Sequence, residues 1–360
     1  MTDMPAFVVS PNKRRLSKAA RTDLLIDPAF GKFFSDHMVT IRWSEGKGWH
    51  SAEVRAREPF PIDPANAVLH YAQEIFEGMK AYRTADGRIS LFRPEENARR
   101  FRKSAERMAM PPISEALFLT AVEKLVEIDR DWIPEGPGSL YLRPFMFANE
   151  AFLGVRPAAE YIFCVIASPA GPYFKGGGRP LNLWVSEQFT RAAPGGTGAA
   201  KCGGNYAASL LAQAEAIRHD CDQVVFLDAA EHRWVEELGG MNIFFVLEDR
   251  IVTPPLGTIL AGITRASIIA LARDAGLLVE EQPYSFDDWR ADAHSGKLRE
   301  AFACGTAAVV AAIGKVHYKT GAFTHGDGGI GATTAQLRAR LVNIQRGIEP
   351  DAHGWLRFLG

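Results

Sequence analysis

The sequence predicts a mixed α/β (α+β) protein with two domains, and three observations support this prediction. The chain has 360 residues, 47% hydrophobic and 23% charged, which is the composition of a globular protein with room for two cores. Patterns typical of strands and of helices both occur along it. Residues 168–180 hold three prolines and four glycines, a composition typical of a domain boundary. We therefore expect a first domain over 1–170, a linker over 171–182 and a second domain over 183–360.

Strands and helices are predicted in order along the first domain. Alternating residues at 37–43 predict a strand, and the turn-rich residues 44–48 lead into a second one. Apolar residues with helical spacing predict a helix that opens at 92–94 and another over 114–130. The nearly continuous apolar run at 161–167 predicts a strand that is buried on both faces.

A further strand, predicted over 139–147, carries a candidate ligand site. Successive side chains of a strand point to opposite faces, so Tyr141 and Arg143 share one face. An arginine beside a tyrosine can receive a carboxylate. From the residues alone, Tyr71 and Phe76 are most simply interpreted as ordinary core aromatics.

The second domain is predicted to begin with a strand at 181–186, which leads into a glycine-rich segment around Lys201. Glycines let the backbone adopt positive φ and let a ligand approach closely. A lysine held away from water has its pKa lowered toward the neutral, nucleophilic amine that carbonyl chemistry needs. The residues alone leave open a more common alternative, which is a surface loop with a solvated lysine.

Three later segments also have candidate ligands. Glu236 and Glu237 stand just before Leu238, a glycine pair and an apolar strand; such acids are usually solvated, but one could lie under a cofactor nitrogen. A helix that begins with Ile263 and Thr264 presents backbone N–H groups, which form an anion site. Thr306 follows a glycine and is a second possible phosphate ligand.

Charge, cysteine content and missing motifs exclude several classes. The 41 Lys and Arg against 42 Asp and Glu give no bias toward nucleic acid or anionic membranes. The four cysteines form no CxxC or CxxH pair, which favours reduced thiols in the cytosol over disulfides or a metal site. No apolar run reaches the ~18 residues of a membrane span. The glycine-rich segment Gly196-Thr197-Gly198 is followed by Ala-Ala-Lys, so the dinucleotide pattern GxGxxG fails there at its third glycine. The P-loop, GxSxG and HExxH patterns are absent, and the basic residues at 13–21 are interpreted as an exposed arm.

Several segments together carry a family resemblance. They are the lysine loop, EELGGMNIFF, TPPLGTILAGITR and CGTAA, with FFSDHM, HYAQEIFEGMKAY, LFRPEENARR, SLYLRP and GGNY in the order of the family. The chain resembles the class IV pyridoxal-phosphate aminotransferases, and among them the branched-chain amino acid aminotransferases, from Phe30 to the C-terminal helix. The resemblance implies fold type IV, with a smaller N-terminal α/β domain and a larger C-terminal pseudo-barrel domain that binds pyridoxal 5'-phosphate.

The resemblance also implies roles for single residues. Lys201 would be the Schiff-base lysine and general base, and Glu237, rather than Glu236, the partner of the pyridine nitrogen. Tyr206 would hydrogen-bond the cofactor's phenolic oxygen. The phosphate ligands would be Arg100, Thr306 and the backbone amides of Ile263 and Thr264. The substrate residues would be Phe30, Tyr71, Phe76, Tyr141, Arg143, Val155, Tyr173 and Ala307, with Trp184 as an additional candidate and Val155 supplied by the neighbouring subunit.

The activity that the resemblance implies is transfer of the amino group of L-leucine, L-isoleucine or L-valine to 2-oxoglutarate, by a cytoplasmic homodimer of branched-chain amino acid biosynthesis. Two alternatives stay open: a D-amino acid or amine transaminase or an aminodeoxychorismate lyase of the same fold, and a non-catalytic phosphate-ligand or nucleotide-binding module. Ala308 and Ala311 stand where some relatives carry a redox CxxC, so no thiol switch is expected. Gly240 stands where some relatives have threonine.

Overall fold

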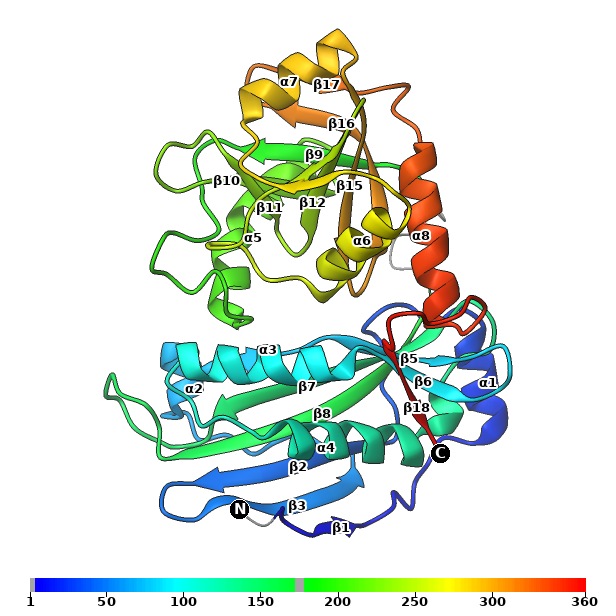
Figure 1. Ribbon diagram of the computed structural model, residues 1–360. Coiled ribbons are helices and arrows are strands. Elements are labelled where there is room, and N and C mark those ends of the chain that lie inside the picture. Colours follow the sequence, from blue (N-terminus) through cyan, green and yellow to red (C-terminus); the bar gives the residue numbers. More distant parts are fainter. Residues whose placement is uncertain (1–3, 172–177) are drawn as a thin grey trace. The chain divides into compact units, whose positions relative to one another are not determined.

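The computed structural model describes residues 4–171 and 178–360 and divides the chain into two compact units (Figure 1). The first unit comprises Met1–Tyr173, Ala200–Gly203 and Gln345–Gly360, and the second comprises Phe174–Ala199 and Gly204–Ile344. The expected division therefore differs from the structure in two segments, the four residues around Lys201 and the C-terminal end. Both join the first unit because they hydrogen-bond to its strands.

The first unit is built on one mixed sheet. Its strands lie in the order β1 (Phe7–Val9), β3 (Gly48–Ala56), β2 (His37–Ser44), β8 (Glu160–Ala170), β7 (Ser139–Ala148), β5 (Met79–Arg83), β6 (Ile89–Phe92) and β18 (Leu356–Leu359), and β4 (Glu74–Phe76) pairs with β7. β18 pairs antiparallel with β6. The predicted strands at 37–43, 139–147 and 161–167 are thus confirmed, and β8 is buried along nearly its whole length.

Two amphipathic helices, α3 (Pro94–Arg107) and α4 (Glu115–Ile128), pack against each other and complete the first core. α3 begins with a proline and two glutamates, residues that suit the free N–H groups and the positive end of a helix. Ser114 caps α4 by accepting the N–H of Leu117 at 3.2 Å. The rings of Phe101 and Phe118 lie 5.3 Å apart between the two helices and extend the core onto Phe163 of β8.

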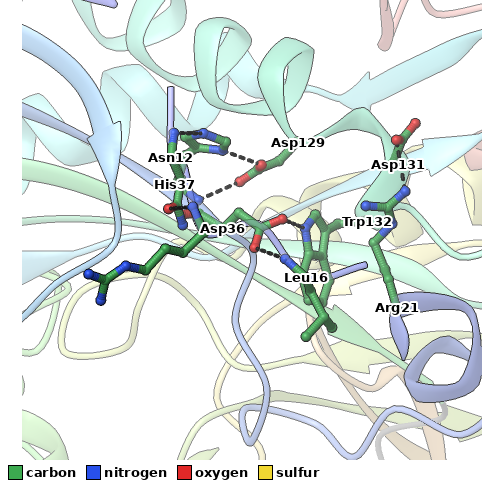
Figure 2. Close-up of polar contacts among 9 residues, drawn as sticks. Asn12, Leu16, Arg21, Asp36, His37, Asp129, Asp131 and Trp132 are labelled. Atoms are coloured by element: carbon green, nitrogen blue, oxygen red, sulfur yellow. Dashed lines mark hydrogen bonds and ion pairs between the residues drawn. The ribbon is translucent and has the colours of Figure 1, made fainter. Parts of the chain in front are cut away.

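The first unit also contains α1 (Lys18–Ile26), α2 (Ala67–Tyr71) and a short 3-10 helix, η1 (Arg130–Trp132). α1 forms part of the basic segment that was predicted to be an exposed arm, and no residue of α1 is fully buried. The arm is nevertheless attached to the unit by contacts of Leu16 and Arg21 (Figure 2). Arg21 pairs with Asp131 at 2.8 Å, and the N–H of Leu16 donates to the Asp36 carboxylate at 3.1 Å.

His37 forms the buried part of this attachment (Figure 2). The backbone N–H of Asn12 can only donate, so Nε2 of His37 accepts it at 2.9 Å. Nδ1 therefore carries the ring proton and donates it to Asp129 at 2.6 Å. Asp129 also accepts the backbone N–H of His37 at 3.0 Å, so one carboxylate at the end of α4 fixes the orientation and the tautomer of the ring.

The second unit is built on a second mixed sheet. Its strands lie in the order β11 (Val235–Leu238), β10 (Gln223–Leu227), β9 (Leu181–Ser186), β16 (Val309–Tyr318), β15 (Leu298–Gly305), β12 (Asn242–Leu247), β13 (Ile251–Thr253) and β14 (Val279–Glu281), and β17 (Gly321–Thr324) pairs with β16. Its helices are α5 (Gly203–Arg218), α6 (Ile263–Asp274), α7 (Phe286–Ser295) and α8 (Ala332–Gln345). Trp289 of α7 is fully buried and packs edge-on against Phe245 and Phe323 at 4.9 and 5.6 Å.

Two further findings apply to the residues that the structure describes. None of their helices is long and apolar enough to cross a membrane. Within the same ranges, no group of three or more His, Cys, Asp and Glu side chains is arranged to hold a metal ion.

Candidate active site

Lys201 lies in a short segment whose backbone is held by the first unit. Its carbonyl accepts the N–H of Phe76 at 3.0 Å, and its own N–H donates to the hydroxyl of Ser104 at 3.0 Å. Two residues later, the N–H of Gly203 donates to the carboxylate of Glu74. The amino group of Lys201 lies 4.8 Å from the centre of the Phe76 ring. These contacts hold the backbone of Lys201 against β4 and α3 of the first unit.

One face of α3 supplies the residues next to this segment. Asn97, Arg100 and Ser104 recur at the spacing of successive helical turns and therefore point the same way. Arg100 donates from Nε and Nη2 to the two carboxylate oxygens of Glu77 at 2.7 and 2.8 Å, and the Asn97 amide donates to the same group at 2.7 Å. Arg102, by contrast, is exposed. Arg100 is thus a buried guanidinium with a fixed orientation.

The carboxyl group of Glu77 is fully buried and ionised at neutral pH. Burial alone would raise its pKa, but the charge and hydrogen bonds of Arg100 outweigh burial, and the charge of Lys201 and the Asn97 hydrogen bond add to them. The resulting pKa lies below the ordinary value of 4.5. Glu77 therefore orients Arg100 and places a negative charge near Lys201.

An aromatic patch with one cation lies on the sheet beside Lys201. Arg143 donates to the hydroxyl of Tyr141 at 3.3 Å, which confirms that the two share one strand face. The guanidinium carbon of Arg143 lies 4.8 Å from the centre of the Phe76 ring, and Phe30 packs edge-on against Tyr141 at 5.0 Å. Gly78 is required here because a Cβ at this position would overlap the Tyr141 hydroxyl.

In the second unit, Glu237 lies in a buried ion pair. Nη1 of Arg191 is 2.8 Å from Oε1 of Glu237, and each of the two side chains is 3% exposed. The backbone N–H of Leu260 donates to Oε1 at 2.9 Å, and the amide of Asn242 donates to Oε2 at 3.2 Å. A cation and two hydrogen-bond donors offset the cost of burying this carboxylate.

Glu236, its neighbour on β11, has different surroundings. Adjacent residues of a strand point to opposite faces, and the carboxyl group of Glu236 accepts the hydroxyl of Thr258. Burial raises its pKa above the ordinary value of 4.5; the Thr258 hydrogen bond and the charge of Arg191 oppose this shift, and the charge of Asp228 adds to it. The two adjacent acids therefore have separate environments.

The start of α5 positions Tyr206. Asn205, which precedes it, donates to the carbonyl of Thr197 at 2.8 Å and accepts the Thr197 hydroxyl at 2.6 Å, so the glycine loop is tied to the helix. Gly240 faces the ring of Tyr206, since a Cβ there would lie 3.8 Å from it. Gly198 has no room for a side chain, because a Cβ would overlap the carbonyl of Thr258.

The remaining cofactor candidates lie at the start of α6 and in the turn between β15 and β16. α6 begins after Gly262, which has no side chain with which to cap the first N–H groups, including those of Ile263 and Thr264. The N-terminal end of a helix attracts anions. Thr306 and Ala307 occupy the β15–β16 turn and are partly exposed.

The other four substrate candidates have different positions in the chain. Tyr71 is half-buried at the end of α2, and Val155 is 89% exposed on the loop that joins β7 to β8. Trp184 stacks on His219 at 3.9 Å within the small core under α5, which makes it a packing residue rather than the pocket residue it was considered to be. Tyr173 lies outside the described residues.

Sequence reasoning missed five residues that hold the others in place. They are Glu74, Glu77, Ser104, Arg191 and Asn242. An acid near a glycine drew attention to Glu236 and Glu237, and Glu77-Gly78 could have been found by the same signal. The partnership of Arg191 with an acid 46 positions away has no local pattern that would reveal it.

Comparison with known proteins identifies the family. The model of amino-transferase class IV matches residues 74–316, which include most of the residues described above. The chain therefore belongs to the class IV aminotransferases.

Within this class, the chain is 53% identical over 349 residues to a branched-chain-amino-acid aminotransferase of Mycobacterium tuberculosis, covering 95% of each chain. Among solved structures, it is similar to the branched-chain amino acid aminotransferase of Escherichia coli, with a TM-score of 0.75 and 28% identity over 89% of this chain and 99% of that one. It is also similar to the branched-chain amino acid aminotransferase of Thermobaculum terrenum in its PLP-form, with a TM-score of 0.72 and 26% identity over 89% and 98% of the two chains.

Proposed function

We propose that this chain is a branched-chain-amino-acid aminotransferase. It transfers the amino group of L-leucine, L-isoleucine or L-valine to 2-oxoglutarate, giving branched 2-oxo acids and L-glutamate, in a reversible reaction. The observation that carries the proposal is the 53% identity to an enzyme of that name over 95% of both chains. The aromatic patch around Arg143 supports it, because it offers an apolar surface and a cation to the same substrate side chain.

The family cofactor is pyridoxal 5'-phosphate, and the groups present suit its chemistry. Glu237 would pair with the ring nitrogen, since the Arg191 and Asn242 contacts favour an ionised carboxylate. The phosphate would be held by Arg100, Thr306 and the amides of Ile263 and Thr264. Glycine instead of a capping side chain before α6 leaves the N–H groups of its first turn accessible to an anion. Tyr206 would donate to the phenolic oxygen.

The protein's own contribution is binding, orientation and proton transfer. When bound, the cofactor accepts the electrons that the substrate's Cα–H bond releases. Nζ of Lys201 would link the cofactor to the chain and, once the incoming amino group has freed it, would act as the general base that removes the α-proton of the amino acid and delivers it to the cofactor. Glu77 holds the guanidinium of Arg100 in one orientation, and Ser104 holds the backbone of Lys201. Positioning of this kind places reacting groups without loss of entropy during the reaction.

The substrate side chain would lie on Phe30, Phe76 and Tyr141, with Arg143 at the rim to bind the distal carboxylate of glutamate or 2-oxoglutarate. Tyr71 and Ala307 would contribute contacts to the α-carboxylate. Because the aromatic surface and the cation are separate, one pocket could accept an apolar side chain in one half-reaction and a charged side chain in the other.

We further propose a homodimer, located in the cytoplasm, in which Val155 completes the neighbour's site. Support comes from apolar side chains that are exposed on the β7–β8 loop, Leu153 and Val155, and on α5, Leu210, Leu211 and Ile217. The cytoplasmic location is supported by four free, buried cysteines. Sedimentation of Val155→Asp tests the dimer, and a wild-type protein that sediments as a monomer contradicts it.

A panel of amino donors tests the function. Purified protein, 2-oxoglutarate and single L- or D-amino acids are expected to give L-glutamate only with the L-branched donors. Turnover of D-amino acids or amines instead would be consistent with the fold but would contradict the proposed substrate. Lys201→Ala is the control: it should abolish both turnover and the cofactor's visible absorbance, while the melting temperature of the apoprotein stays near wild type. A wild type that binds the cofactor without any turnover would favour a non-catalytic module.

A further inference from the structure

Glu74 lies between the segment that carries Lys201 and the cation of the aromatic patch. The register of β4 on β7 pairs Glu74 with Phe147 and Phe76 with Phe145. Residues directly opposite each other share a face, and so do residues two apart on one strand. Glu74 and Phe76 therefore point to the same side of the sheet as Arg143.

The carboxyl group of Glu74 has two interactions of different kinds. One oxygen accepts the backbone N–H of Gly203, two residues after Lys201, and a Cβ on Gly203 would overlap this carboxyl group. The second interaction is electrostatic: the charge of Arg143 favours the ionised form of Glu74. Burial is the largest influence on this carboxyl group and raises its pKa above 4.5, while the Gly203 hydrogen bond and the charge of Arg143 oppose the rise.

We propose that Glu74 is a positioning and specificity-determining residue of this aminotransferase: it fixes the Lys201 segment through Gly203, and it is the resident counter-charge of Arg143. This inference rests on the proposed function. When the substrate side chain is apolar, the negative charge of Glu74 balances Arg143 in a site where an unbalanced cation is costly. When the substrate side chain is a carboxylate, Glu74 competes with it for the same cation and weakens its binding.

Two substitutions separate the two roles. Glu74→Gln keeps a side-chain oxygen for the Gly203 N–H but removes the charge, and Glu74→Ala removes both. We expect Glu74→Gln to lower KM for glutamate and 2-oxoglutarate by ~3-fold or more, because the substrate carboxylate no longer shares Arg143 with a second negative charge. KM for leucine should stay within ~2-fold, or rise, since Arg143 is then left without its counter-charge.

Hydrogen exchange of the holoenzyme, followed by mass spectrometry, measures the positioning role without turnover. Peptides that contain 201–203 should exchange at the wild-type rate in Glu74→Gln and at least ~10-fold faster in Glu74→Ala. Glu127→Gln, which removes one exposed acid from α4 of the same unit, is the matched control and should change neither measurement.

Three results would overturn the proposal: equal changes in KM for leucine and glutamate in Glu74→Gln, an unchanged KM for glutamate, or wild-type exchange of 201–203 in Glu74→Ala. If Glu74→Ala does not fold, the ratio of the two KM values in Glu74→Gln decides alone. Failure of the proposed function is a separate outcome, because it would appear as absent leucine turnover in the wild-type enzyme.

Discussion

Truncation of Arg143 is expected to discriminate between the two kinds of substrate. Arg143 reaches the Tyr141 hydroxyl at 3.3 Å and lies 4.8 Å from the centre of the Phe76 ring, and its Nε has no hydrogen-bond partner among the described residues. A buried donor of this kind gains from a carboxylate that a substrate brings. In Arg143→Ala, that gain is lost for glutamate and 2-oxoglutarate only.

The magnitude follows from the charge of the bond that is lost. A hydrogen bond to a charged group contributes ~1.5 to ~3 kcal/mol, which corresponds to a ~10- to ~150-fold loss in kcat/KM for glutamate. Leucine makes no such bond, and we expect its kcat/KM to change less than ~5-fold, through lost packing on Phe76. Arg143→Met is the matched variant, since it keeps most of the apolar stem without the charge.

Single-turnover measurements with each amino acid separately are the appropriate assay, because steady-state rates combine both half-reactions. The reasoning is refuted if Arg143→Met loses activity with leucine and with glutamate to the same extent. Equal losses would mean that Arg143 stabilises the sheet through its contacts with the rings of Phe76 and Tyr141 and does not select the substrate.

Three further predictions follow from the acids. Glu237→Gln should slow α-proton removal by more than ~100-fold, and Glu236→Gln by less than ~3-fold, in single-turnover reactions with leucine; the reverse order would assign the ring nitrogen to the wrong acid. The pKa of Glu77 is lowered from 4.5, so the stability that ionised Glu77 gives to the fold is present above pH 4.5 and is lost as the pH falls through the folded pKa. The melting temperature of Glu77→Gln should therefore fall less at acid pH than that of the wild type. Parallel curves of melting temperature against pH would argue against this prediction. The pKa of Glu236 is raised from 4.5, so the folded state favours its protonated form and loses stability as the pH rises through the folded pKa. Glu236→Gln should therefore raise the melting temperature more at pH 8 than at pH 4. An equal shift at both pH values would contradict the prediction.

The fold was predictable where one element determines its own pattern. The strand at 181–186 coincides with β9, and the helix predicted from Ile263 coincides with the start of α6, because apolar periodicity and the preceding glycine are local signals. β18 has no comparable signal: four residues near the end of the chain become a strand only because β6 offers an edge.

The candidate site shows the same limit. The residues that carry chemistry, such as Lys201 and Glu237, stand two residues before a glycine, and glycines are visible in a sequence. The residues that hold them have no such local signal. Arg191 becomes a partner of Glu237 through a buried ion pair, and Ser104 becomes a partner of Lys201 across 97 positions. Such partnerships depend on tertiary packing, to which a single sequence gives no direct access.

The pairing of β18 with β6 has a consequence for how the protein is made. Arg357 of β18 pairs with Glu95 of α3 at 3.1 Å, across 262 residues of chain. At the ~5 to ~20 residues per second of translation, the ribosome needs ~13 to ~50 s to synthesise that interval. Throughout this time β6 is an open strand edge on a nascent chain, which is a template for aggregation. The first unit to emerge is therefore the last to be closed, and a chain that terminates a few residues early would leave that edge permanently exposed.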